Sequence, residues 1–85
     1  MTGICGLYKH TRGAKEEAYK ERMAEEYRQL KERYDKLHKI LTKTEAGTLD
    51  FTLNCPVDLL KEQKRHMGNY LYCLEVRAEI EGIEL

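Results

Sequence analysis

The sequence predicts an all-α fold: an antiparallel two-helix hairpin of the coiled-coil kind, carrying an N-terminal arm and assembled as an oligomer. Charged residues make up 35% of the 85 residues and hydrophobic residues 41%, a balance typical of helices with long solvated faces. A heptad pattern of apolar side chains runs through residues 14–45, and a second amphipathic segment follows the single proline. We therefore expect an arm at 1–13 and a hairpin at 14–85.

The first helix is predicted over residues 14–45, which contain neither glycine nor proline. Its apolar side chains recur at alternating spacings of four and three, the pattern of a coiled-coil seam, at Met23, Tyr27, Leu30, Tyr34, Leu37 and Leu41. Gly47 follows the helix and is a natural C-terminal cap.

A linker is predicted over residues 46–55. Leu49, Phe51 and Leu53 alternate with polar residues, as in a short extended segment. A single strand has no partner in a two-helix protein. We expect these three side chains to fold back over the helix ends as an apolar plug, with a β-hairpin as the alternative.

The second helix is predicted over residues 56–81, because Pro56 suits a first helical position and Asp58 suits the first turn. Gly68 lies in the middle of this helix, where glycine costs about 1 kcal/mol relative to alanine. It indicates either tolerated strain or a close approach of the first helix. Gly82 ends the helix, and Ile83 or Leu85 can fold onto its last turn.

The formal net charge is zero, so bulk charge favours neither nucleic acid nor membrane as a partner. The three cysteines are too few and too scattered for a disulfide framework, which favours a reducing compartment. No apolar run approaches the ~20 residues that span a membrane, and the N-terminus lacks the apolar core of a signal peptide. These patterns predict an intracellular protein.

Self-association is predicted because six tyrosines exceed what one seam between two helices can bury. Tyr70 and Tyr72 point to different sides of the second helix, which indicates a second apolar face. The residues expected at an interface with another copy or with a partner are Tyr19, Tyr27, Tyr34, Met67, Tyr70, Leu71 and Tyr72.

The N-terminal segment MTGICGLYKHTRG differs from the rest of the chain because it combines glycines with basic residues. Glycine-bounded amides and a helix N-terminus form an anion site, arginine binds phosphate with two hydrogen bonds, and tyrosine stacks on bases. The residues of such a nucleotide clamp would be Tyr8, Lys9, His10, Arg12 and Lys15, with Arg22 as a further contributor from the second turn of the helix. The alternatives are a flexible basic tail, or an apolar arm in which Ile4, Leu7 and Tyr8 dock on a neighbouring subunit.

Catalytic and metal sites are not predicted. The three histidines and three cysteines contain no paired ligand spacing, so neither a metal nor another cofactor is expected. Cys5 near His10 is a suggestive nucleophile and base, but a glycine-rich segment holds such a pair poorly. Glu32 and Asp35 dilute the basic end of the first helix, which disfavours nucleic-acid binding.

Residues 19–85 resemble a known family. The motifs EYxxLKERYxKL, EAGTLDFxxNCP and MxxYLxxLxxRAEIEGI are similar to those of small helical-hairpin proteins from tailed phages and prophages of gut bacteria, related to a crAss-like-phage protein. The resemblance implies a phage origin and a helical structure, without an established activity. The first thirteen residues depart from the usual start of that family.

The size and predicted fold also resemble small oligomeric phage proteins that defeat host immunity, although a fold alone does not define function. This wider resemblance implies a non-enzymatic counter-defence protein in the cytoplasm of the infected bacterium. The favoured hypothesis is sequestration of a cyclic nucleotide signal between subunits. The alternatives are an inhibitor that docks on a host defence protein, as anti-CRISPR proteins do, and a small structural or regulatory phage protein.

Overall fold

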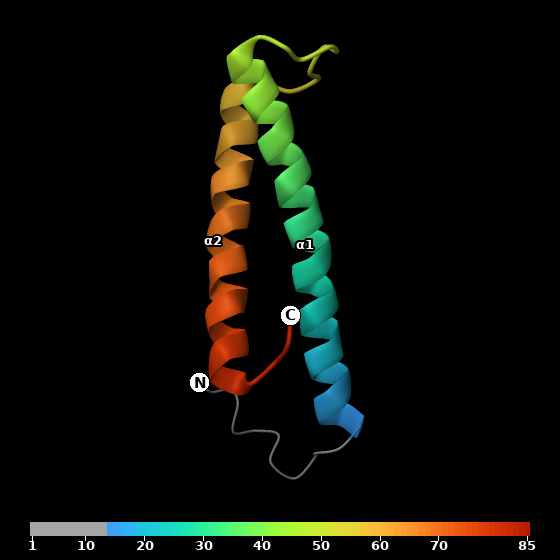
Figure 1. Cartoon of the computed structure of the whole chain (residues 1–85). Coiled ribbons are helices and arrows are strands. Elements are labelled where there is room, and N and C mark those ends of the chain that lie inside the picture. The colour runs from blue at the N-terminus through green and yellow to red at the C-terminus, as the bar shows by residue number, and fades with distance from the viewer. Residues whose placement is uncertain (1–13) are drawn as a thin grey trace.

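The protein is a hairpin of two long helices. The computed structural model describes residues 14–85, with side chains from residue 18 onward. Helix α1 (Ala14–Ala46) and helix α2 (Val57–Glu81) lie side by side and run in opposite directions (Figure 1). Within residues 14–85 there is no strand, so the predicted all-α class is confirmed and the β-hairpin alternative is wrong.

Helix α1 ends in a glycine cap. Gly47 has φ of +78°, in the left-handed region that glycine adopts without strain. The Thr48 N–H then donates to the Lys43 carbonyl at 2.9 Å, which satisfies one of the free carbonyls at the helix end. This cap turns the chain out of α1 and into the linker.

Helix α2 begins one residue later than its proline suggests. Pro56 is extended, with φ of −60° and ψ of 143°, and is the residue before the helix rather than its first member. At the other end Gly82 adopts φ of +70°, and the Ile83 N–H donates to the Ala78 carbonyl at 2.9 Å. Ile83 consequently folds back and packs against the core.

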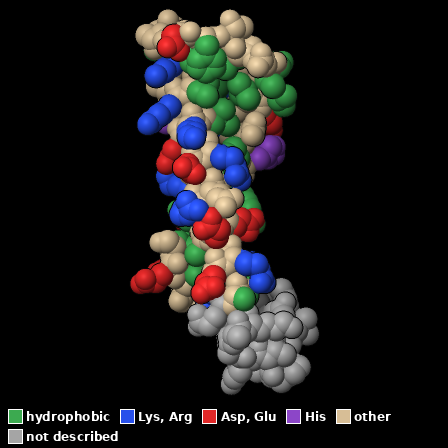
Figure 2. All heavy atoms as spheres, turned by 90° about the vertical axis from the view of Figure 1, so that its right-hand side faces the viewer, with side chains coloured by type: hydrophobic (Ala, Val, Ile, Leu, Met, Phe, Trp, Pro, Cys, Tyr) green, Lys and Arg blue, Asp and Glu red, His purple; other side chains and the backbone are tan. Residues whose placement is uncertain are grey.

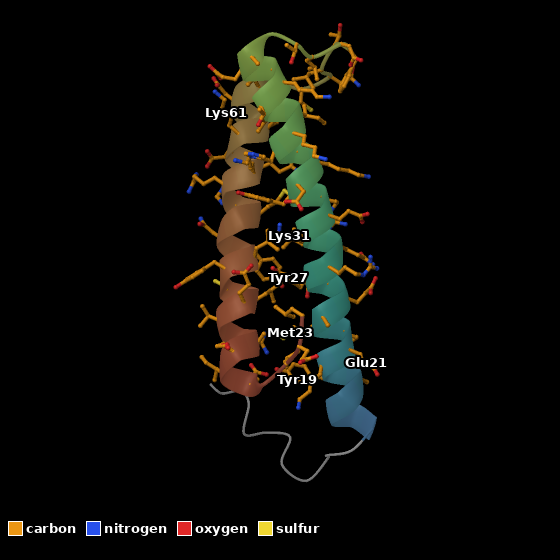
Figure 3. All side chains as sticks on the ribbon, in the orientation of Figure 1. Tyr19, Glu21, Met23, Tyr27, Lys31 and Lys61 are labelled. Atoms are coloured by element: carbon orange, nitrogen blue, oxygen red, sulfur yellow. The ribbon has the colours of Figure 1, made fainter. Side chains whose placement is uncertain are left out.

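The core is a thin seam between the two helices. Its buried members share the helix faces that point at each other, and are Met23, Leu30, Leu41, Leu71, Leu74 and Ala78. Tyr19, Tyr27, Tyr34 and Met67 are partly buried against this seam. Figure 3 shows Tyr19, Met23 and Tyr27 of α1 extending toward α2. So few buried side chains give a small hydrophobic contribution to stability, as expected of a short chain.

Tyrosine hydroxyls reinforce the seam at its edges. Each of three tyrosines donates a hydrogen bond to a glutamate of the other helix: Tyr19 to Glu81, Tyr27 to Glu75 at 2.7 Å, and Tyr70 to Glu26 at 2.8 Å. The hydrogen bonds to Glu75 and Glu26 raise the pKa of Tyr27 and Tyr70, since they stabilise the protonated phenols. These bonds fix the register of α1 against α2.

The linker differs from the predicted apolar plug. Leu49 and Leu53 are half-buried, but Phe51 leaves 54% of its surface exposed. Figure 2 shows hydrophobic side chains gathered at this end of the hairpin, above a surface where acidic and basic side chains alternate. The prediction is therefore wrong for Phe51, because two helix ends offer too little area to cover three large side chains.

Candidate functional site

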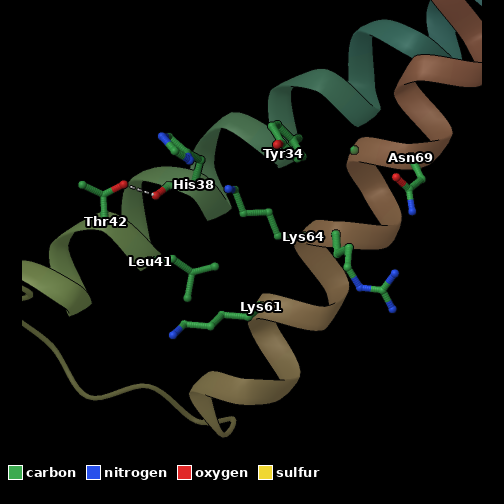
Figure 4. Close-up of a pocket in the computed structure, with 9 residues that line it drawn as sticks. Tyr34, His38, Leu41, Thr42, Lys61, Lys64 and Asn69 are labelled. Atoms are coloured by element: carbon green, nitrogen blue, oxygen red, sulfur yellow. Dashed lines mark hydrogen bonds between the residues drawn. The ribbon is translucent and has the colours of Figure 1, made fainter.

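A groove lies between the helices in the half of the hairpin nearest the linker. It has a volume of about 660 Å³ and is open to solvent (Figure 4). Helix α1 contributes Tyr34, His38, Leu41 and Thr42, and helix α2 contributes Lys61, Lys64, Arg65, Gly68 and Asn69. Leu41 is the apolar floor, since it is buried in the seam below the polar walls.

Gly68 shapes the end of the groove. A Cβ at this position would lie 3.2 Å from Cε1 of Tyr34, closer than most real contacts. The missing side chain lets the Tyr34 ring rest against the backbone of α2. This placement agrees with the close-approach interpretation of Gly68, and it leaves the ring as an aromatic wall of the groove.

The groove is cationic. Lys61, Lys64 and Arg65 lie on adjacent turns of α2, and none of the residues that line the groove is acidic. The Lys64 ammonium lies 5.4 Å from the centre of the Tyr34 ring, within the range of a cation–π contact. In Figure 4 the Lys64 side chain extends across the groove toward α1.

Two glutamates outside the lining hold the cations in place. Lys61 Nζ lies 3.8 Å from Glu45 Oε1, and Arg65 forms an ion pair with Glu62. His66 Nε2 lies 3.2 Å from the same Glu62 carboxylate. The hydrogen bond from Arg65 holds the pKa of Glu62 below its ordinary value. All of these side chains are at least half exposed, so the pairs are weak and can exchange for a ligand anion.

This combination suits a ligand that is both anionic and flat. Lysine and arginine donate charge-assisted hydrogen bonds to phosphate oxygens, and a tyrosine face accepts a base. Asn69 and His38 add polar groups at the rim. The Thr42 hydroxyl is already used, since it donates to the His38 carbonyl at 2.8 Å. The groove is thus suited to binding.

A second hollow, of about 500 Å³, lies near the C-terminus and has a different character. Its walls carry both signs of charge, with Glu21 and Glu25 beside Arg28 and Lys31. Glu21 and Glu25 in this lining would repel an anion, whereas no residue that lines the groove near the linker is acidic, so that groove is the better candidate.

No predicted clamp residue whose side chain the structure describes lines this groove. Tyr8, Lys9, His10 and Arg12 fall outside the described residues, and Lys15 is placed by backbone alone at the start of α1. Arg22 is exposed on α1. Ala14 precedes His38 by about 36 Å along a helix that rises 1.5 Å per residue. Within one chain the start of α1 and the groove are therefore at opposite ends.

The predicted interface residues divide into two groups. Tyr19, Tyr27, Tyr34 and Met67 pack against the seam within the chain, and Leu71 is 5% exposed, which leaves it almost no surface for another molecule. Tyr70 and Tyr72 keep 44% and 67% of their surface exposed. The apolar side chains of the first group are used in packing α1 against α2 within the chain.

The groove was not predicted from the sequence. The segment KEQKR places Lys61, Lys64 and Arg65 at the i, i+3 and i+4 spacing of one helix face, which is a recognisable signal. His38 and Tyr34 join them only through the register of the hairpin. The basic residues at the N-terminus are easier to recognise as a possible site because they lie close together in the sequence.

Other kinds of site find no support in residues 14–85. No group of three or more potential metal-ligating side chains occurs in this part of the chain. Within the same residues, neither helix is apolar enough over a sufficient length to cross a bilayer. Cys55 and Cys73 are exposed free thiols.

The fold and the groove define a small α-helical binding protein. The chain belongs to the Sequestin family, which it matches over residues 17–80, a range that includes both helices and the whole groove. The family name denotes sequestration, which is a binding function rather than catalysis. No curated protein and no solved structure matches the chain.

Proposed function

We propose that the protein sequesters an anionic nucleotide signal, of the cyclic nucleotide class, in the groove between α1 and α2. The observation that carries the proposal is the lining itself, which has three cations, one histidine, one aromatic wall and no acidic residue. Membership in a family named for sequestration supports the same function.

The biological role we propose is counter-defence by a phage protein in the cytoplasm of its bacterial host. A protein that holds an immune signal lowers its free concentration and so prevents activation of the effector. This role requires a high protein concentration and tight binding, because sequestration is stoichiometric. A small, two-helix chain suits production in such quantity.

The N-terminal clamp remains a prediction beside the groove. Its residues 8–12 lie outside the described residues. They precede the start of α1, which lies at the end of the hairpin far from the groove, so a ligand bound by both the clamp and a groove would lie between two copies. Self-association, proposed from the thin seam and the exposed apolar side chains, provides that second copy.

The decisive experiment combines native mass spectrometry with calorimetric titration. The protein is purified from bacteria that express nucleotide-signal synthases and then titrated with a panel of cyclic mono- and dinucleotides. We expect a retained mass of several hundred daltons and a loss of at least tenfold in affinity for Lys64→Ala. Lys39→Ala, which removes an exposed lysine of α1 outside the groove, is the matched control and should bind normally.

Arg12→Ala in the same titration tests the clamp. A loss comparable to that of Lys64→Ala supports a shared site, and normal binding assigns the ligand to the groove alone. If the purified protein carries no ligand and binds none of the panel, sequestration of a nucleotide is contradicted.

A second function is favoured by one observation. Tyr72 is 67% exposed, and tyrosines are common anchors of protein interfaces. An inhibitor of a host defence protein would lose its target with Tyr72→Ala and tolerate Lys64→Ala. A structural or regulatory protein would bind neither nucleotide nor defence protein.

A further inference from the structure

The side of α2 that faces α1 follows a heptad pattern, and one charged residue interrupts it. The side chains at successive spacings of four and three are Leu60, Lys64, Met67, Leu71, Leu74 and Ala78. Lys64 is half-buried, whereas the other lysine and both arginines of α2 are exposed. A lysine at a core position of a coiled coil lowers stability, because burial removes part of the water around its ammonium group.

The apolar core stops at this lysine. The core cluster and the side chains packed against it end on α2 at Met67, the seam position next to Lys64. On the linker side of Lys64, Leu41 is buried without belonging to the cluster, and Leu60 is only half-buried. Lys64 and Leu41 both line the groove. The groove is therefore the part of the seam in which apolar packing is interrupted.

Lys64 also lacks the kind of partner that its neighbours have. The two other lysine and arginine side chains that line the groove each lie beside a glutamate. Among the side chains that the structure describes, Lys64 forms no ion pair, and its ammonium lies over the Tyr34 ring instead. A half-buried ammonium without a carboxylate is the group in this groove that gains most from an added anion.

We propose that a bound anion completes the seam at Lys64, so that binding stabilises the half of the hairpin nearest the linker. The inference rests on the proposed function, since the anion is a phosphate of the sequestered nucleotide. In the free protein, few apolar contacts hold this half together and the ammonium has no counter-charge. A phosphate between the helices accepts charge-assisted hydrogen bonds from Lys64 and supplies that charge. Binding to the folded form then stabilises it.

This coupling gives a physical reason for a lysine at a core position. An apolar side chain there would continue the seam and stabilise the free protein, but it would remove the group that binds the anion. Stability of the free protein and affinity for the anion are therefore opposed at Lys64. One substitution should move them in opposite directions.

The first test measures stability without any ligand. Lys64→Met keeps the length of the side chain and removes its charge. We expect it to raise the urea midpoint of unfolding by about 0.5 M, because methionine continues the apolar seam. Lys61→Met makes the same change at an exposed position of α2 and is the matched control, which should keep the wild-type midpoint. No rise for Lys64→Met, or an equal rise in both variants, would overturn the proposal.

The second test uses inorganic pyrophosphate as the probe, with sodium chloride at equal ionic strength as the reference. Hydrogen exchange of the backbone amides is followed in each half of the hairpin. We expect pyrophosphate to slow exchange about tenfold more in residues 34–42 and 57–68 than in residues 20–30 and 71–81. Lys64→Met should remove this protection. Absence of slowing, equal slowing in both halves, or full protection in Lys64→Met would contradict a seam completed by the anion.

The nucleotide titration described above separates this inference from the proposed function. Protection by pyrophosphate that depends on Lys64, without binding of any cyclic nucleotide, would support the completed seam and contradict nucleotide sequestration. Tight binding of a cyclic nucleotide that Lys64→Met does not weaken would overturn the completed seam and leave sequestration standing.

Discussion

Gly68 of α2 and Tyr34 of α1 meet where the seam opens into the cationic groove, and a Cβ on Gly68 would lie 3.2 Å from the Tyr34 ring. Glycine at this position lowers the helix propensity of α2, but it leaves room for the Tyr34 ring, which forms the aromatic wall of the groove. Its φ is not in the left-handed region, so the position requires a small residue rather than an unusual backbone. Space, not conformation, explains glycine here.

A double-mutant cycle at this pair tests that explanation. In a Tyr34→Ala background, Gly68→Ala should raise the free energy of unfolding by about 0.5–1 kcal/mol, the gain in helix propensity. With Tyr34 present the gain should shrink or reverse, because the new methyl group displaces the ring. Urea denaturation followed by circular dichroism measures both. Equal gains in the two backgrounds would contradict a close contact between Gly68 and Tyr34.

The open end of the hairpin is held by a polar cluster. Tyr19 donates to Glu81, and Arg77 Nη2 donates to the Tyr19 hydroxyl at 2.6 Å. Tyr19→Phe should lower the free energy of unfolding by about 0.5–1.5 kcal/mol, since it removes these bonds and keeps the ring. Tyr72→Phe is the control, because Tyr72 is exposed, and it should change stability by less than about 0.5 kcal/mol. A similar effect of both variants would show that the cluster contributes nothing.

Much of this architecture is predictable from the sequence. The heptad spacing of Met23 and Leu30 defines the seam because only a helix places them on one face. Gly47 and Gly82 both adopt the left-handed conformation that their positions after the helices suggest. The exposure of Phe51 was not predicted, because burial of an apolar side chain depends on how much surface the neighbouring elements offer, and the sequence does not show that area.

The groove was not predictable to the same degree. Lys61 and Lys64 share a face of α2 by spacing alone, but their location opposite Tyr34 and His38 depends on the register between the helices. That register rests on the contact of Gly68 with Tyr34 and on bonds such as that of Tyr27 to Glu75. These pairs lie tens of residues apart in sequence, where local patterns carry no information.

The Glu81 carboxyl makes stability sensitive to acid. Partial burial raises the pKa of Glu81, but hydrogen bonds from Tyr19 and Arg77 outweigh it and hold the pKa below the ordinary value of 4.5. A lowered pKa in the folded state means that Glu81 stabilises the fold above its unfolded pKa, and that this contribution is lost as pH falls through the folded pKa. The free energy of unfolding should therefore decline from roughly pH 5 downward.

Glu81→Gln should flatten this decline, because an amide does not titrate. The measurement is a series of urea denaturation curves across the acid range. Glu79→Gln, which changes an exposed glutamate two residues away, should retain the wild-type slope. If Glu81→Gln also retains the wild-type slope, the acid sensitivity comes from other carboxylates. Glu25 and Glu62 are examples, because hydrogen bonds from Arg28 and Arg65 lower their pKa values.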